Sequence, residues 1–150
     1  MNTRATGLIP HQIVDTCEEC TSDIAVFNDG WSHIASRNQD TLNVEFEGTN
    51  CKHPGPLQIQ FSKDIDPTYL SVQVLNANYP VFNMWARPAG QGEWRELFPR
   101  YWNFFEGKEN EAVGRTLDFR VDCTQAGGGV VYLENVSVRA GRRVNATANC

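Results

Sequence analysis

The chain has 150 residues, of which 41% are hydrophobic, enough for one packed core and too many for a disordered tail. Its net charge of −5 disfavours nucleic acid and anionic membranes as partners, because both attract basic surfaces. No apolar stretch approaches the ~20 residues of a membrane span, and residues 1–16 lack the apolar core of a signal peptide. The balance favours a neutral partner.

The first third of the chain is expected to contain short strands and a helix. Ile13–Asp15 reads as a strand that enters a tight polar turn at Cys17–Cys20. Asp29–Ser36 has the apolar spacing of one or two helical turns. Leu42–Phe46 alternates and predicts a strand whose first, third and fifth side chains face inward. Residues 51–56 hold two prolines and a glycine, which predict a rigid joint.

Beyond this joint, apolar and polar residues alternate in short segments separated by turn residues. Pro88–Gly92 is expected to be a hairpin loop and Gly127–Gly129 a turn. Seven or eight such strands predict an antiparallel β-sandwich. The predicted strands fall at residues 57–61, 69–74, 82–86, 94–97, 101–105, 117–121 and 130–138. In the third of them, the side chains expected to face inward are Phe82, Met84 and Ala86.

Aromatic side chains occupy outward positions in two of these strands. Alternation places Tyr69 opposite the apolar residues of its strand, and Trp102 lies in a second ring-bearing strand. Side by side, two such strands would form a flat aromatic platform of the kind that binds the faces of pyranose rings. Trp94 and Phe104 are instead assigned to turn packing and to the core.

The cysteines and sequons indicate an oxidising, extracellular setting. The five cysteines leave one unpaired if the chain is complete, and Cys123 and Cys150 are candidates to pair. The sequons at Asn135 and Asn145 are glycosylation candidates. The cysteines are Cys17, Cys20, Cys51, Cys123 and Cys150.

The first three cysteines are also compatible with a zinc site. Cys17, Cys20, Cys51 and His53 are the ligand types of a Cys₃His site, but the second tight pair of a zinc ribbon is missing. Disulfides are therefore the favoured interpretation, and no metal or cofactor is predicted.

The ordered series of segments resembles expansins. Tyr69–Pro80, Gly92–Trp94, the ring-bearing strand 101–105 and Gly114–Val121 are similar to the expansin C-terminal domain, and Val14–Cys20 resembles a turn in the N-terminal domain. The resemblance implies an all-β protein in which residues 57–140 form an immunoglobulin-like, carbohydrate-binding sandwich. Residues 1–52 would be an incomplete remnant of a double-psi β-barrel, and residues 141–150 a tail.

The resemblance also implies a function. Expansins are secreted wall proteins that bind and loosen polysaccharides such as cellulose without hydrolysis, so we expect an extracellular monomer with a polysaccharide partner. Tyr69 and Trp102 match the family's aromatic line, whereas Thr68 stands where the family has a third ring. Lys63 matches a basic residue beside that surface, and outward-facing Trp85 is a candidate to replace the lost ring.

Catalysis is not expected. Asp15 matches a barrel aspartate of the family, but the family's essential second aspartate falls on Ala25, with Asp23 two residues away. Hydrolysis of a glycoside uses a pair of carboxylates. The alternatives are a weak endoglucanase or lytic transglycosylase that uses Asp15 with Asp23, and a protein-interaction sandwich like the grass-pollen allergens.

Overall fold

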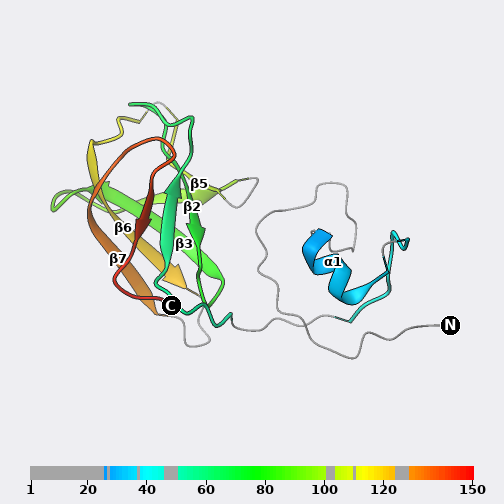
Figure 1. Ribbon diagram of the computed structural model, residues 1–150. Coiled ribbons are helices and arrows are strands. Elements are labelled where there is room, and N and C mark those ends of the chain that lie inside the picture. The colour runs from blue at the N-terminus through cyan, green and yellow to red at the C-terminus, as the bar shows by residue number, and fades with distance from the viewer. Residues whose placement is uncertain are drawn as a thin grey trace. The chain divides into compact units, whose positions relative to one another are not determined.

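The chain divides into two compact units, Met1–Thr49 and Asn50–Cys150, and the boundary falls beside the predicted joint at residues 51–56. Within the part of the chain that the structure describes, no helix is long and apolar enough to cross a membrane. The computed structural model describes residues 26, 28–36, 38–45, 51–100, 104–109, 111–123 and 129–150 (Figure 1).

The first unit contains helix α1, which spans Asn28–Ile34 and confirms the helix expected there. Asp29 lies in its first turn, where a carboxylate interacts favourably with the helix dipole. The indole nitrogen of Trp31 donates to the carbonyl of Gln39 at 3.0 Å, which folds the following segment back onto the helix.

The strand expected at Leu42–Phe46 is wrong in its described part. Residues 41–45 form no strand, and Val44 is 52% exposed. Alternation makes a strand only where a neighbouring strand supplies hydrogen bonds and packing, and none of the described strands pairs with this segment. The strand expected at Ile13–Asp15 and the turn at Cys17–Cys20 lie outside the described residues.

The second unit is an eight-stranded antiparallel sheet, which confirms the all-β class. The strands follow the order β7-β6-β3-β4-β5-β2-β1-β8. Because β4 pairs with both β3 and β5, the two layers expected of a sandwich are joined into one nearly closed, barrel-like sheet (Figure 1). The strands are β1 (Gln58–Phe61), β2 (Ser71–Leu75), β3 (Val81–Pro88), β4 (Arg95–Pro99), β5 (Phe104–Glu106), β6 (Thr116–Cys123), β7 (Val130–Ser137) and β8 (Arg143–Asn145).

Alternating side chains fill the interior of this sheet. Phe61 of β1 meets Phe119 of β6 edge to face, with ring centroids 5.9 Å apart. These two rings join the β1 side of the sheet to the β6 side. The largest fully buried side chains are Phe61, Phe119, Leu57, Ile59, Met84, Val72, Val74 and Val121.

Two expectations for side-chain direction are wrong. Phe82 was expected to face inward but is 67% exposed, since a register shift between Val81 and Asn83 interrupts the alternation. Phe104 was assigned to the core but is only partly buried, and Phe105 takes the inward position beside Val72.

The C-terminal residues belong to the fold. Residues 143–145, expected in a tail, form β8, which pairs with β1. Cys123 and Cys150 form a disulfide with their Cα atoms 6.1 Å apart, as expected. The amide of Asn149 donates to the carbonyls of Gly55 and Asn76 at 2.7 and 2.9 Å. Cys150 is thereby tied to the end of β6, and Asn149 to the segments that flank β1 and β2.

Candidate functional site

The outward side of β8, β1, β2 and β5 is lined by amide side chains, and we call it the amide face. Strand register places Arg143, Gln60, Gln73 and Phe104 in one row across these four strands. Asn145, Gln58 and Leu75 form the next row. Directly paired residues in antiparallel strands point to the same side of the sheet, so each row lies on one surface.

Hydrogen bonds between neighbouring strands hold these side chains in place. The amide of Gln58 donates to Asn145 Oδ1 at 2.8 Å. The guanidinium of Arg143 donates to Gln60 Oε1 from Nη2 at 2.7 Å and from Nε at 3.2 Å. A side-chain amide both donates and accepts hydrogen bonds, as a sugar hydroxyl does. The amide face therefore presents an ordered set of groups that match a polyhydroxylated ligand.

Tyr69 enters β2 from a tight turn at the edge of this face. Asp66 Oδ1 accepts hydrogen bonds from the backbone N–H of Thr68 at 2.6 Å and from its hydroxyl at 2.8 Å. The Thr68 N–H is the main reason that the pKa of Asp66 lies below its ordinary value. Backbone bonds between Asp66 and Tyr69 close the turn. The turn fixes the direction in which the Tyr69 ring leaves the chain.

The far end of the Tyr69 ring is anchored to β5. Its hydroxyl donates to Glu106 Oε1 at 2.5 Å, and Arg100 Nε lies 3.3 Å from Glu106 Oε2. Partial burial, followed by this bond to Glu106, raises the pKa of Tyr69. The ring is therefore held at both ends and stays neutral at neutral pH. Phe98 is paired with Glu106 and is 46% exposed, which adds an outward ring beside it.

The other residues of the predicted platform are placed unevenly. Trp102 lies outside the described residues, so its pairing with Tyr69 stays a prediction. Arg100 and Phe104, which flank residues 101–103 in the chain, are joined by a hydrogen bond of 2.8 Å from the N–H of Arg100 to the carbonyl of Phe104. Thr68 is exposed beside Tyr69, with its hydroxyl bound to Asp66. Lys63 is exposed in the turn after β1.

Trp85 is not brought to the amide face. It lies on β3, where it pairs with Glu96 on one side and Arg120 on the other, in the part of the sheet formed by β4, β3, β6 and β7. Its indole nitrogen donates to Asp122 Oδ2 at 3.3 Å. The strand order places β4 and β5 between β3 and β2, a separation that the sequence did not indicate.

The predicted catalytic remnant, Asp15, lies outside the described residues, as do Asp23 and Ala25. Cys17 and Cys20 do as well, while Cys51 is a partly buried free thiol. Within the described ranges, no group of three His, Cys, Asp or Glu side chains is arranged to hold a metal ion.

The sequon asparagines are both exposed, Asn135 on β7 and Asn145 on β8. Asn135 has a positive φ of 55°, and its backbone N–H is bound to Asp118. Asn145 lies on the amide face, where its Oδ1 accepts from Gln58. The accessibility of both side chains is consistent with the glycosylation predicted for them, which remains a prediction.

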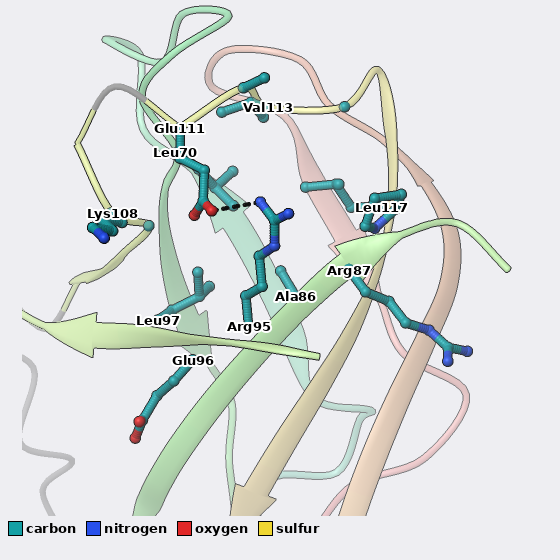
Figure 2. Close-up of a pocket in the computed structure, with 14 residues that line it drawn as sticks. Leu70, Ala86, Arg87, Arg95, Glu96, Leu97, Lys108, Glu111, Val113 and Leu117 are labelled. Atoms are coloured by element: carbon teal, nitrogen blue, oxygen red, sulfur yellow. Dashed lines mark ion pairs between the residues drawn. The ribbon is translucent and has the colours of Figure 1, made fainter. Parts of the chain in front are cut away.

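A small cavity opens on another side of the sheet (Figure 2). Its volume is about 50 Å³, and Leu70, Leu97 and Leu117 are among its lining residues. Arg95 Nη1 and Glu111 Oε1 form an ion pair across it at 2.6 Å (Figure 2). Small-molecule sites commonly enclose about 300–1,000 Å³, so this cavity is a packing defect bridged by an ion pair.

The sequence pattern predicted the aromatic residues of a binding surface but not the amide face. Its signal is present in Leu57–Phe61, where glutamine occupies both outward positions between three buried apolar residues. Glutamine at both of those positions, instead of lysine or glutamate, is the feature that could have indicated a neutral polar surface.

Neither a protein-family model nor a curated protein matches the sequence. Among solved structures, the fold resembles a mutant expansin of Clavibacter michiganensis in complex with cellohexaose, with a TM-score of 0.54 and 19% identity over 65% of this chain and 47% of that one. The apo expansin from the same organism gives a TM-score of 0.53 and 18% identity over 71% of this chain and 48% of that one. The chain has an expansin-like fold and spans about half the length of the structures it matches.

Proposed function

We propose that this chain binds a neutral wall polysaccharide, cellulose or a related β-glucan, without cleaving it. The observation that carries the proposal is the amide face, an ordered row of hydrogen-bonding side chains with the anchored ring of Tyr69 at its edge. The expansin of similar fold with cellohexaose bound gives independent support. The net charge of −5 is also in keeping with a neutral partner.

Tyr69 and Trp102 would stack on pyranose faces while the amides bind the hydroxyl groups. Burying about 40–50 Å² of apolar ring surface per stacked sugar contributes about 1 kcal/mol at ~25 cal/mol/Å². A few such contacts give a weak, reversible complex once the cost of association is subtracted. Lys63 and Thr68 would contact the ligand at the rim, beside the Tyr69 turn.

Cleavage is not part of the proposal. Hydrolysis of a glycoside uses two carboxylates across the scissile bond, and Ala25 stands where the resemblance to expansins requires the second of them. The Cys123–Cys150 disulfide fits an oxidising, extracellular setting, so we also propose secretion to a wall and action as a monomer. Wall loosening would follow if binding competes with contacts between polysaccharide chains.

A pull-down on microcrystalline cellulose tests the binding site. Tyr69→Ala and Trp102→Ala should each weaken binding about fivefold, equivalent to about 1 kcal/mol per ring. The double variant should lose roughly 25-fold if the rings act independently. Phe82→Ala is the matched control, because it removes a ring that is 67% exposed and far along the strand order from β2.

Wild-type affinity in the double variant would show that the platform is wrong. A reducing-end assay on soluble β-glucan distinguishes the enzyme alternative. Release of reducing ends that disappears in Asp15→Asn would favour a weak glycan-cleaving enzyme instead.

A further inference from the structure

A second ring-bearing surface lies on the outward side of β3, β6 and β7. Strand register places Trp85, Arg120 and Tyr132 in one row across these three strands. Trp94, just before β4, contacts Tyr132 with ring centroids 6.1 Å apart and an interplanar angle of 51°. We call this surface the ring face, and it consists of Trp85, Arg87, Trp94, Arg120 and Tyr132.

Arginine side chains hold the two indoles in place. The guanidinium carbon of Arg87 lies 4.4 Å from the centroid of Trp94, and that of Arg120 lies 5.8 Å from the centroid of Trp85. Figure 2 shows Arg87 pointing away from the Arg95–Glu111 pair and its cavity. Tyr132 remains 50% exposed beside them. The ring face is therefore fixed in shape before any ligand arrives.

Both arginines of the ring face are paired with carboxylates. Arg87 Nε lies 3.2 Å from Asp118 Oδ2, and Arg120 donates to both oxygens of Asp122 at 2.7 and 2.9 Å. Glu96 extends the row through its pairing with Trp85 and adds a negative charge. An acidic ligand would have to compete with these carboxylates. Rings among neutralised ion pairs suit a ligand with apolar faces and many hydroxyl groups, which describes a neutral sugar.

The ring face continues into a groove at the open edge of the sheet. β7 and β8 are the two ends of the strand order, and the groove beside them has a volume of about 360 Å³. Tyr132 lines it together with the polar side chains of Glu134, Asn145 and Thr147. This volume lies in the range of small-ligand sites, about 300–1,000 Å³. Trp85 and Tyr132 are two strand spacings apart, about 10 Å, which is close to the length of a disaccharide.

We propose that the ring face and the adjoining β7–β8 groove form a second binding surface for a neutral glycan chain. This surface shares the ligand class of the proposed function, but its rings lie on β3, β6 and β7, away from Tyr69, and only Asn145 of β8 borders both surfaces. One molecule would then hold two segments of polysaccharide, one on each face.

Titration of the ¹⁵N-labelled full chain with cellohexaose tests this proposal, because indole N–H signals report on each face separately. Trp85 and Trp94 report on the ring face, Trp102 on the proposed platform, and Trp31 serves as the reference in the other unit. We expect the Trp85 and Trp94 signals to shift. Tyr132→Ala should weaken the affinity read from them about fivefold and leave the affinity read from Trp102 unchanged.

Three controls sharpen the test. Tyr132→Phe keeps the ring and should bind like the wild type. Tyr69→Ala should have the reciprocal effect, lowering the affinity read from Trp102 alone. Hexagalacturonate, the acidic counterpart, should bind more weakly than cellohexaose by the concentration dependence of the Trp85 and Trp94 signals, and tighter binding would overturn the assignment to neutral glycans.

The two proposals fail in different ways. If the Trp102 signal moves while those of Trp85 and Trp94 stay fixed at saturation, the second surface is wrong and the proposed function stands. If only Trp85 and Trp94 respond, the second surface stands and the Tyr69 platform is wrong. If no indole signal moves, both binding surfaces are wrong.

Discussion

The two outward faces of one sheet present different chemistry. On β1 and β8 the exposed positions carry amides and an arginine that bind one another across the strands. On β3 and β6 the corresponding positions carry an indole and two arginines. Each arginine pairs with a carboxylate and lies over an indole ring. The amide face is suited to orienting a ligand through directional hydrogen bonds. The ring face is suited to binding a ligand through burial of apolar surface. The difference shows that one alternating pattern can carry two chemically distinct surfaces.

Loss of the Cys123–Cys150 disulfide should have the largest effect and should not distinguish the faces. The bridge ties the end of β6 to the C-terminal segment beside β1, and the two cysteines are 27 positions apart in the sequence. A loop of that length predicts a loss of about 3–4 kcal/mol in the free energy of unfolding for Cys150→Ser. Urea denaturation measures it, and Cys51→Ser, which removes a free thiol, should change little. Equal stability in both variants would contradict the expectation.

Asp118→Ala should damage the ring face selectively. Oδ2 of this 3% exposed carboxylate accepts from the N–H of Gly90 and Oδ1 from the N–H of Asn135, both at 2.9 Å, and it also pairs with Arg87. Gly90 has a φ of +68°, so a side chain there would be strained. We expect a loss of about 3 kcal/mol, because the substitution leaves buried donors unpaired.

The measurement for Asp118→Ala is urea denaturation combined with hydrogen exchange. Exchange of the backbone amides in β3, β6 and β7 should accelerate before that of amides in β1 and β2. Asp122→Ala, which breaks a more exposed ion pair on the same strand, is the control and should cost about 1 kcal/mol or less. Uniform acceleration across both faces would show that Asp118 stabilises the whole sheet.

Acid should weaken the protein through the same carboxylate. Burial raises the pKa of Asp118. The N–H groups of Asn135 and Gly90 and the Arg87 side chain together lower it by more than burial raises it, so the pKa lies below 3.8. The stability that Asp118 confers is therefore complete above 3.8 and is lost as the pH falls through the lowered folded value. The urea midpoint should decrease more between about pH 7 and about pH 3 in the wild type than in Asp118→Asn. Parallel profiles would exclude this role.

Tyr69→Phe should have the smallest effect. It removes the hydroxyl that binds Glu106 and keeps the ring, so stability should fall by about 1 kcal/mol and cellulose binding should change little. The pKa of Tyr69 is raised, so the bond contributes at neutral pH and is lost as the pH rises through a value above 10.0. An alkaline spectrophotometric titration should show one late-titrating tyrosine that the variant lacks. An unchanged titration would place that tyrosine elsewhere.

Local patterns predicted local features well. The helix at α1 and the inward side chains of β1, β2 and β6 follow from periodicity within a few residues. The errors arise where a neighbour decides the outcome. Phe82 is turned outward by a register shift against β6, and residues 41–45 alternate without a partner strand. Asp118 can be buried with its charge because Gly90 and Asn135, 28 and 17 positions away in the chain, donate hydrogen bonds to it.

The amino-acid sequence by itself determined which side most strand residues face, because alternation depends only on the neighbouring residues of the chain and fails where a register shift intervenes, as at Phe82. Only the tertiary structure decided which outward residues share a surface. Gln60 and Arg143 are 83 positions apart and meet because β8 pairs with β1. Tyr69 and Trp85 are close in sequence and lie on different faces because β5 and β4 stand between β2 and β3. Strand order is set by packing between distant segments, and a binding surface is set by strand order.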